Sequence, residues 1–272
     1  KRIPNWAKLK KYLVIGNPID HSLSPKLHNY WITINNVEAI YEKKKLVSNE
    51  IQDLINDIKV KKISGINVTV PFKKEVINFL DVLSEEAQIT QSVNTIYFEN
   101  NKVVGHNTDI DGFESSIKKI NYKLATKKAF ILGSGGVVPS IIFALQRMGI
   151  DEVFVSGRTK SKAENLKSLF KNIKIVDWGE LPNFDIIINA TSLGLVKHDK
   201  IEIDFSNVGK NKLFFDVIYN PKETNFLKQG KELGNLTENG KMMFIFQAQK
   251  SFQKWHNIIP KVDKEVERLL DD

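Results

Sequence analysis

The sequence predicts an α/β protein with two domains: an N-terminal α/β domain with a mainly parallel sheet, and a second domain with a Rossmann-type doubly wound sheet. Short runs of β-branched residues alternate with segments of helical periodicity along the chain, which is typical of sheets covered by helices. Two of these runs, at residues 12–15 and 129–132, end in a glycine turn ahead of a predicted helix. At 272 residues, with 42% hydrophobic and 26% charged content, the chain is long enough for two ordinary globular domains.

The first predicted domain extends from the start of the chain to about residue 112. Strands are expected at residues 12–15, 39–41, 66–70, 95–98 and 103–106, and helices at 26–36, 50–59 and 72–79. The run Ile63, Ile66, Val68 and Val70 is short and β-branched and stops at Pro71, which indicates a strand covered on both faces.

The second predicted domain begins its strand series at residue 128. Strands are expected at residues 129–132, 153–156, 173–176, 186–189 and 214–217, separated by helices at 139–148, 161–170 and 224–233. Two final helices, at 242–255 and 260–270, are expected to return to the first domain. The predicted domains are therefore residues 1–112 with 240–272, and residues 113–239.

Composition excludes several classes of protein. With no cysteine and five scattered histidines, disulfides, thiolate nucleophiles and Cys-based metal sites are excluded, and no metal is predicted. No apolar stretch approaches the roughly 20 residues that span a bilayer, and residues 1–11 lack a signal-peptide pattern, so a cytoplasmic protein without a membrane partner is expected. The net charge of +8 is dispersed, so small anionic ligands are expected rather than nucleic acid. The sequence shows no heptad repeat, so both a monomer and a homodimer stay open.

Polar side chains gather where the strands of the first domain end. Thr69 and Lys73 follow the strand at 66–70, and Asn94 precedes the next predicted strand. Open α/β sheets bind their ligands at the carboxyl ends of parallel strands. A ligand site is therefore expected here, although Lys73 could also be a solvated residue in the first turn of a helix.

Two further segments carry the same kind of signal. Ser22 and Ser24 follow the strand at 12–15, and Asn107, Thr108 and Asp109 follow the strand at 103–106. Each segment has a structural alternative. Ser24 before a proline could be a helix N-cap, and residues 107–109 could form an Asx or Ser/Thr turn.

The second domain carries a dinucleotide-binding signal. The segment from Gly133 to Gly136 lies between a strand and a helix start, where glycines allow a pyrophosphate to approach the backbone. Val138 replaces the third glycine of the strict motif, so a tight turn without a ligand stays open. About 20 residues on, where NAD-binding domains place an acid, stands Arg158, which suits the 2′-phosphate of NADP; the alternative is a basic loop that opens a helix.

A third loop of this domain follows the strand at 186–189. It contains Thr191 and Ser192, which are expected near the ribose and nicotinamide of the cofactor. A Ser/Thr turn without a ligand is the structural alternative.

Several motifs together resemble the shikimate dehydrogenase family, whose members are NADP-dependent enzymes of aromatic amino-acid biosynthesis. The resemblance runs in order from about residue 12 to residue 252. The motifs are Ser22-Leu-Ser24-Pro25, Asn67-Val-Thr-Val-Pro-Phe-Lys73, Asn107-Thr-Asp109, Gly133-Ser-Gly-Gly136, Asn189-Ala-Thr-Ser192 and Gln247-Ala.

The resemblance implies reversible reduction of 3-dehydroshikimate to shikimate, with Lys73 and Asp109 as the catalytic pair. Lys73 could transfer the proton or mainly orient the hydroxyl, and its sequence context leaves both roles open. The implied substrate-binding residues are Ser22, Ser24, Thr69, Lys73, Asn94, Asp109, Tyr219 and Gln247. The implied NADP-binding residues are Glu85, Gly133, Ser134, Gly135, Gly136, Val137, Gly157, Arg158, Thr159, Lys160, Ser161, Lys162, Thr191, Ser192, Val217 and Gly240.

The sequence departs from the family pattern on the cofactor side. Gly157 replaces a common asparagine, Met242 stands at a frequent glycine, and residues 137–139 replace a smaller, alanine-led helix start. Two other hypotheses stay open: a broader quinate/shikimate dehydrogenase that uses NAD or NADP, and a catalytically silent NADP-binding protein.

Overall fold

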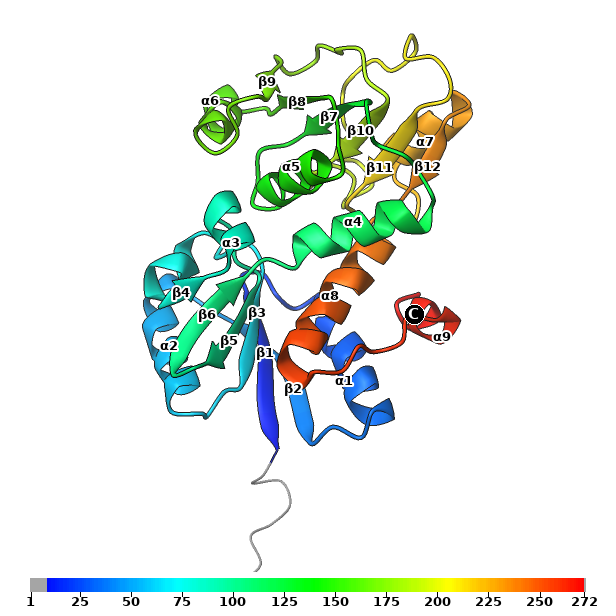
Figure 1. Ribbon diagram of the computed structural model, residues 1–272. Coiled ribbons are helices and arrows are strands. Elements are labelled where there is room, and N and C mark those ends of the chain that lie inside the picture. Colours follow the sequence, from blue (N-terminus) through cyan, green and yellow to red (C-terminus); the bar gives the residue numbers. More distant parts are fainter. Residues whose placement is uncertain (1–8, 272) are drawn as a thin grey trace, which may run out of the picture. The chain divides into compact units, whose positions relative to one another are not determined.

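The computed structural model describes residues 9–271, which divide into two compact units (Figure 1). Unit 1 contains the residues up to Gly112 and those from Ile245 onward, and unit 2 is Phe113–Phe244. Both units are α/β, and the predicted fold class is confirmed.

The sheet of unit 1 has six strands in the order β2-β1-β3-β5-β6-β4. Its pairs are parallel except those of β5, which is antiparallel to both neighbours. The exception follows from the link between β5 and β6, because Asn100 (φ 51°) and Asn101 (φ 62°) form the two-residue turn that joins antiparallel strands. The strands are β1 (Lys10–Gly16), β2 (Ala39–Lys45), β3 (Gly65–Val68), β4 (Val82–Leu83), β5 (Thr95–Glu99) and β6 (Lys102–His106).

The helices of unit 1 follow their hydrophobic periodicity. In α2, buried residues recur at Ile51, Leu54, Ile55 and Ile58, which is the spacing of one helix face, and they join the core of the sheet. The helices are α1 (Ser24–Ile34), α2 (Ile51–Lys59), α3 (Glu85–Thr90), α8 (Lys241–His256, in unit 1 from Ile245) and α9 (Lys264–Leu269), with 3₁₀ turns at Ser48–Glu50 and Glu75–Phe79.

Two sequence predictions for unit 1 were wrong in detail. The strand expected at 66–70 ends at Val68, and Val70 is 61% exposed rather than covered on both faces, because the chain leaves the sheet ahead of Pro71. The helix expected at 72–79 is only a 3₁₀ turn over Glu75–Phe79. β4 and α3 were not predicted, since two and six residues are too few for a periodic pattern.

The last turns of α8 are attached to this sheet (Figure 1). The Trp255 indole Nε1 donates to the carbonyl oxygen of Ile96 at 3.2 Å, and the Ser251 hydroxyl lies 2.8 Å from that of Thr95. The following segment is attached to α1, since Trp31 Nε1 donates to the carbonyl oxygen of Lys261 at 3.0 Å.

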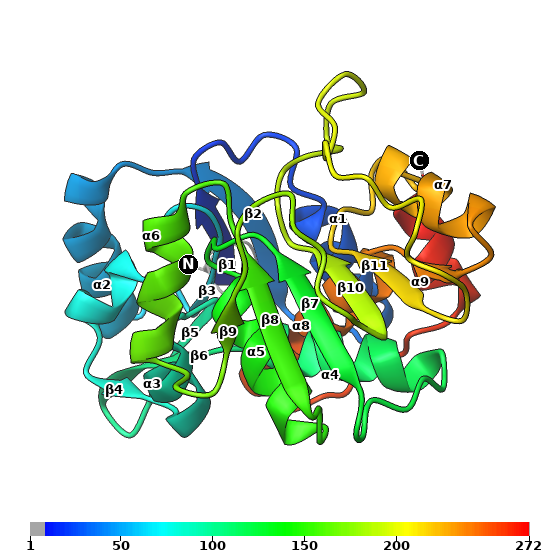
Figure 2. The same ribbon diagram turned by 90° about the horizontal axis from the view of Figure 1, so that it is seen from above.

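Unit 2 is a doubly wound domain, as predicted. Its six strands are all parallel in the order β12-β11-β10-β7-β8-β9, which is the strand order of dinucleotide-binding folds. Figure 2 shows its central strands side by side. The strands are β7 (Lys128–Leu132), β8 (Glu152–Ser156), β9 (Lys174–Ile175), β10 (Ile186–Asn189), β11 (Leu213–Asp216) and β12 (Leu236–Glu238), of which β12 was not predicted because it is short and largely polar.

The helices of unit 2 are α4 (Asp109–Lys119, in unit 2 from Phe113), α5 (Val138–Arg147), α6 (Lys160–Asn165) and α7 (Asn225–Glu232). The helix predicted at 161–170 divides into α6 and a 3₁₀ turn at Leu166–Ser168. Arg147 on α5 holds α4 through a bidentate ion pair with Glu114, with donor–acceptor distances of 2.6 and 3.0 Å.

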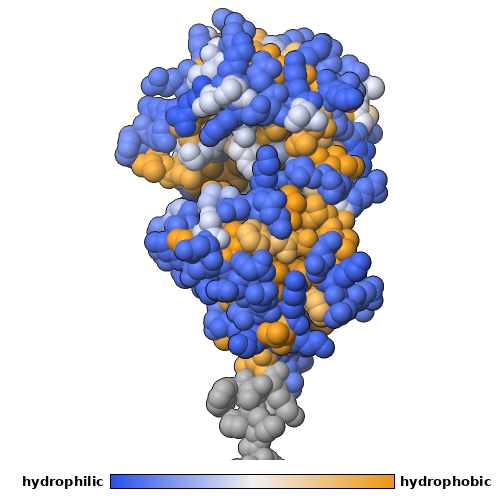
Figure 3. All heavy atoms as spheres, turned by 90° about the vertical axis from the view of Figure 1, so that its left-hand side faces the viewer, coloured by the Kyte–Doolittle hydropathy of each residue, from blue (hydrophilic) through white to orange (hydrophobic). Residues whose placement is uncertain are grey.

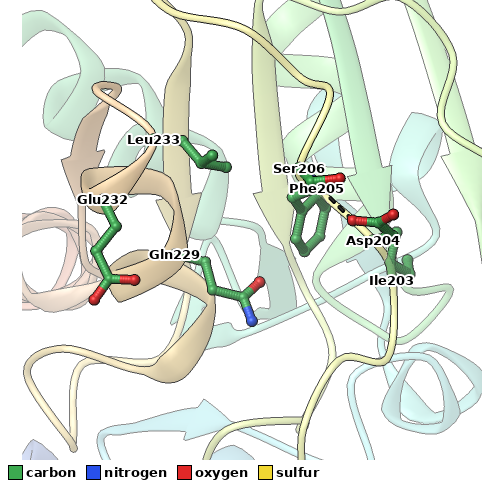
Figure 4. Close-up of a pocket in the computed structure, with 7 residues that line it drawn as sticks. All are labelled: Ile203, Asp204, Phe205, Ser206, Gln229, Glu232 and Leu233. Carbon is green, nitrogen blue, oxygen red and sulfur yellow. Dashed lines mark hydrogen bonds between the residues drawn. The ribbon is translucent and has the colours of Figure 1, made fainter.

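The face drawn in Figure 3 is mainly polar, with smaller apolar areas. No helix within residues 9–271 is long and apolar enough to cross a membrane. Unit 2 also carries an open pocket of about 290 Å³ between α7 and the segment before β11 (Figure 4). Its lining contains no residue of the predicted site: Ile203, Asp204, Phe205, Ser206, Gln229, Glu232 and Leu233.

Candidate active site

The predicted site residues of unit 1 meet at one edge of its sheet. β1 and β3 are parallel and end there, at Gly16 and Val68. Because β5 is antiparallel to β3, it begins at the same edge, where Asn67 pairs with Thr95. β6 ends at that edge too, with His106 opposite Thr95. The topology therefore brings together the segments at 17–24, 69–73, 94–95 and 107–109.

Lys73 and Asp109 form an ion pair at this edge. Lys73 Nζ donates to Asp109 Oδ2 at 2.7 Å, and the side chains are only 14% and 9% exposed. Asp109 is the first residue of α4, where the helix dipole favours a negative charge. The Asx turn considered from the sequence is present, since the Asp109 backbone N donates to Asn107 Oδ1 at 3.1 Å, yet the turn leaves the carboxylate facing Lys73.

Asn94 and Gln247 join this pair. The buried Asn94 amide Nδ2 lies 2.8 Å from Thr108 Oγ1, 3.3 Å from Asp109 Oδ1 and 3.4 Å from Gln247 Oε1 on α8, and its two hydrogens are shared among these acceptors. Four of the predicted residues, Lys73, Asp109, Asn94 and Gln247, therefore form one connected group.

Ser22 and Ser24 form a second group. The Ser22 hydroxyl accepts a hydrogen bond from the Ser24 backbone N at 3.3 Å. Ser24 is not the N-cap considered from the sequence, because α1 already begins at Ser24 and Leu23 stands at the cap position. Burial raises the pKa of Tyr41, and the nearby Ser24 hydroxyl opposes this shift.

Thr69 lies directly after β3. Its backbone N donates to the carbonyl oxygen of Ile15 at 2.9 Å, which continues the pairing of β3 with β1. Its methyl group occupies the space beside Gly16, where a Cβ would lie 2.5 Å from Thr69 Cγ2. A glycine at position 16 therefore allows Thr69 to lie against the start of residues 17–24, the segment that carries Ser22 and Ser24.

The predicted cofactor residues of unit 2 lie in loops at the carboxyl ends of its parallel strands. Gly133 has φ +121°, and a Cβ there would lie 2.9 Å from the carbonyl oxygen of Ala190 and 3.3 Å from the Thr191 methyl. Gly135 has the opposite environment, since no atom lies within 4 Å of its Cβ position. The turn is thus closely packed at its first glycine and open at Gly135, which fits the approach of a pyrophosphate to the backbone.

The loop after β8 packs on the same turn. A Cβ at Gly157 would lie 3.1 Å from Ser134 Oγ, so glycine makes room for the serine. Arg158 is exposed, and its guanidinium has no ion-pair partner in the part of the chain that the structure describes. Lys160 is held by Asp177 at 2.7 Å, and the hydrogen bond and charge of Asp177 raise the Lys160 pKa.

Asp216 and Asn189 hold the loop after β10. Neither of these roles was predicted from the sequence. Thr191 donates from its backbone N and its hydroxyl to Asn189 Oδ1, at 3.0 and 2.6 Å, so the Ser/Thr turn considered from the sequence is present. Asn189 Nδ2 in turn donates to Asp216 Oδ1 at 3.1 Å. Burial raises the Asp216 pKa to about 6, although hydrogen bonds from Thr224, Ile218 and Asn189 oppose the shift. The sequence did offer one indication of this role, because Asp216 is an acidic residue at the end of an otherwise apolar strand.

Four further predicted residues, Val217, Gly240, Tyr219 and Glu85, have defined places, and the Val217 backbone N donates to the carbonyl oxygen of Asn189 at 3.0 Å. A Cβ on Gly240 would overlap the carbonyl of Val217, so this close approach requires glycine. The Tyr219 ring packs against Phe244 in a tilted arrangement with ring centroids 5.0 Å apart, and burial raises the Tyr219 pKa to about 12. Glu85 is exposed in the first turn of α3 in unit 1. The roles of these residues stay predictions.

The positions that depart from the family pattern are accommodated locally. Pro139 lies in the first turn of α5, where no intrahelical N–H donor is needed. Met242 is buried in the first turn of α8. No cluster of three metal-ligating side chains occurs within residues 9–271.

A doubly wound parallel domain with an open glycine turn, together with a second α/β unit that carries a nearly buried Lys–Asp pair, defines a dinucleotide-dependent oxidoreductase. Sequence models of two domains make this specific. A model described as the shikimate dehydrogenase substrate binding domain matches residues 14–96, and one described as shikimate/quinate 5-dehydrogenase matches residues 115–229. The chain belongs to the shikimate dehydrogenase family, which confirms the resemblance seen in its motifs.

Individual relatives cover nearly the whole chain. The shikimate dehydrogenase (NADP(+)) of Pelagibacter ubique is 58% identical over 262 residues, which are 96% of this chain and 99% of that protein. The crystal structure of shikimate dehydrogenase from Aquifex aeolicus superposes with a TM-score of 0.90 at 35% identity, covering 98% and 99% of the two chains. The Thermus thermophilus enzyme in complex with NADP(H) and shikimate gives 0.88 at 27% identity, covering 97% and 99%.

Proposed function

We propose that the protein catalyses the reversible NADPH-dependent reduction of 3-dehydroshikimate to shikimate, a step of chorismate and aromatic amino-acid biosynthesis. The observation that carries this proposal is the Lys73–Asp109 pair, 2.7 Å apart at the ligand-binding edge of a substrate-domain sheet. The relative from Thermus thermophilus, solved with NADP(H) and shikimate, supports the same choice of substrate and cofactor.

In this proposal each domain has one main task. Residues 1–112 with 240–272 form the substrate domain, and residues 113–239 form the dinucleotide domain. The serines at 22 and 24 would bind the carboxylate of the substrate, because two hydroxyl donors in one short loop suit a planar anion. Thr69, Asn94 and Gln247 would bind its hydroxyl groups. Tyr219 remains a further candidate for the carboxylate.

The reaction moves one hydride and one proton. The loops of residues 133–137 and 191–192 would hold NADPH, which when bound would supply the hydride for the carbonyl carbon of 3-dehydroshikimate. As negative charge develops on the carbonyl oxygen, the Lys73 ammonium stabilises it and donates a proton from Nζ, which yields the alcohol. Asp109 accepts a hydrogen bond from Lys73 Nζ and so directs it, and in the oxidation direction Lys73 would receive the proton back.

The chain's own residues would also select the cofactor. Residues 133–137 would contact the pyrophosphate, and Thr191, Ser192, Val217 and Gly240 would line the rest of the dinucleotide site. Arg158, exposed and without an ion-pair partner within residues 9–271, would bind the 2′-phosphate of NADP. Lys160 would contribute less to binding of the 2′-phosphate, because its charge is already paired with Asp177.

The test follows the absorbance of reduced nicotinamide with purified protein, using shikimate or quinate, each paired with NADP or NAD. Turnover largely confined to shikimate with NADP is expected. Similar efficiency with quinate or NAD would place the protein among broader quinate/shikimate dehydrogenases. Absence of turnover in all four pairs would contradict the proposal and favour a silent NADP-binding protein.

A further inference from the structure

Five buried side chains in unit 1 form a chain of hydrogen bonds that ends on the Asp109 carboxylate. The Tyr41 hydroxyl donates to Asn67 Oδ1 at 2.7 Å, and Asn67 Nδ2 donates to Thr95 Oγ1 at 3.2 Å. Thr95 Oγ1 donates to Asn94 Oδ1 at 3.0 Å, and Asn94 Nδ2 donates to Asp109 Oδ1 at 3.3 Å, besides a shorter bond to Thr108 Oγ1 at 2.8 Å. Every link has its donor on the side of Tyr41 and its acceptor on the side of Asp109.

Backbone groups fix the direction of this chain, because they can act only as donors or only as acceptors. The Asn94 carbonyl oxygen must accept, and it lies 3.0 Å from Asn67 Nδ2. The Thr108 backbone N–H must donate, and it lies 2.7 Å from Asn94 Oδ1. Neither amide can therefore be reversed without placing two donors or two acceptors together. Thr95 consequently accepts from Asn67 and donates to Asn94.

Three hydroxyls form a cluster at Thr95, in the middle of this series of hydrogen bonds. Thr95 Oγ1 lies 2.8 Å from Ser251 Oγ and 3.4 Å from Thr108 Oγ1, and the last two are 3.1 Å apart. Thr95, Thr108 and Ser251 are fully buried. Unpaired polar atoms at such depth cost about 1–3 kcal/mol each, so the cluster holds Thr95 in place.

Tyr41, where the series of hydrogen bonds begins, is also held firmly. The Tyr41 ring stacks on His28 with centroids 4.2 Å apart and an interplanar angle of 3°. The Ser24 hydroxyl lies near the Tyr41 hydroxyl and opposes the rise in the Tyr41 pKa that burial causes. The chain of hydrogen bonds therefore begins beside a serine proposed for the substrate carboxylate and ends at the proposed catalytic pair.

We propose that Tyr41 and Thr95 are positioning residues of the reaction, acting through Asn67 and Asn94 on the Asp109 carboxylate. This inference rests on the proposed function. Both residues are too buried to contact the substrate, at 2% and 0% exposure. Aligned hydrogen bonds polarise one another, so the Asn94 donor to Asp109 is strengthened by the links before it. That donor fixes the carboxylate plane and so directs Lys73 Nζ toward the reacting oxygen.

The first test compares Thr95→Val with Thr95→Ser. Valine keeps the shape but removes the hydroxyl, and it should lower kcat about tenfold while KM for NADPH changes less than twofold. Serine keeps the hydroxyl and should restore kcat to within about twofold of wild type. Wild-type kcat in Thr95→Val, or equal losses in both variants, would overturn the inference.

The second test compares two buried tyrosines. Tyr41→Phe should lower kcat severalfold, whereas Tyr12→Phe should not, although Tyr12 is equally buried at 2% exposure. The double variant Tyr41→Phe with Thr95→Val should be no slower than Thr95→Val alone, because Thr95→Val already interrupts the series of hydrogen bonds. Multiplicative losses, or equal effects of the two tyrosine changes, would contradict the proposal.

A readout without turnover separates this inference from the proposed function. The Asn94 side-chain amide signals in a ¹H–¹⁵N spectrum should move in Tyr41→Phe and stay in place in Tyr12→Phe. Unmoved signals in Tyr41→Phe would refute the coupling even if the enzyme is active. Moved signals in a protein that fails to oxidise shikimate would sustain the hydrogen-bond chain and refute the proposed function instead.

Discussion

The indole ring of Trp255 lies so close to Gly65 that a Cβ atom on Gly65 would overlap it. Gly65 opens β3, and Trp255 lies in the last turn of α8, so the contact attaches that helix to the sheet. The indole Nε1 also donates to the carbonyl of Ile96 on β5. Because α8 carries Gln247 and Ser251, this packing contact determines where two polar groups of the candidate site lie.

Gly65→Ala should therefore destabilise the protein. Forcing a methyl group against the indole should cost about 2 kcal/mol, as overpacking of a core does. Trp255→Leu should lose stability too, but the two changes together should lose less than their sum, because the smaller side chain relieves the overlap. Urea unfolding of the three variants measures this coupling, and additive losses would show that the contact is unimportant.

Replacing Lys73 tests the catalytic pair. Lys73→Ala should lower kcat by at least about 100-fold, with a modest change in KM for shikimate, because the ammonium contributes most when charge develops on the reacting oxygen. Lys74→Ala is the matched control, since Lys74 is the exposed neighbour in the chain. Initial-rate kinetics decide the matter, and a Lys73→Ala variant with wild-type kcat would remove Lys73 from the mechanism.

The fold was predictable wherever elements were long enough to show a period. The parallel strands β1, β7 and β10 are apolar and lie before glycine or polar turns, and the sequence located each one. The antiparallel β5 was not distinguished, since its direction depends on the short Asn100-Asn101 turn rather than on its own residues. β4 and β12, with two and three residues, carry too little pattern to be recognised.

The candidate site was predictable in its residue types but not in its connections. Lys73 and Asp109 stand 36 positions apart in the chain, and only the sheet topology brings them to 2.7 Å. The sequence also failed to indicate Tyr41 and Ser251, because a tyrosine in a strand and a serine in a helix look like ordinary structural residues. Their roles depend on side-chain contacts between distant elements, which no local pattern contains.

Arg158 is expected to set the preference for NADP. Arg158→Ala should raise KM for NADP at least tenfold and change KM for NAD less than twofold, because loss of a charged hydrogen bond to phosphate costs about 1.5–3 kcal/mol. Lys167→Ala, which removes an exposed charge further along the same segment, serves as the control. Equal losses with both cofactors would mean that Arg158 does not bind the 2′-phosphate.

His28 should make the fold sensitive to acid. Burial, helped by the charge of His256, lowers the His28 pKa to about 3, and neither ring nitrogen has a hydrogen-bond partner within residues 9–271. The unfolded chain binds a proton near pH 6.5, so this contribution to stability is complete above that pH and is lost as the pH falls toward 3. His28→Phe cannot titrate, and between pH 7 and 4 it should gain about 3 kcal/mol of unfolding free energy relative to wild type. A constant difference between the two proteins across this range would contradict the prediction.

Asp216 should have the opposite dependence on pH. Its pKa is raised to about 6 by burial, above the ordinary value of 3.8, so the folded state binds the proton more tightly than the unfolded chain. Stability from the protonated form is complete below about pH 4 and is lost as the pH rises through 6. Relative to Asp216→Asn, which cannot titrate, the wild type should lose roughly 2 kcal/mol of unfolding free energy between pH 4 and 7. Denaturant unfolding measures this difference, and a ¹³C titration of the Asp216 carboxyl provides a direct check. An inflection near pH 4 would show that the donors from Thr224, Ile218 and Asn189 outweigh burial.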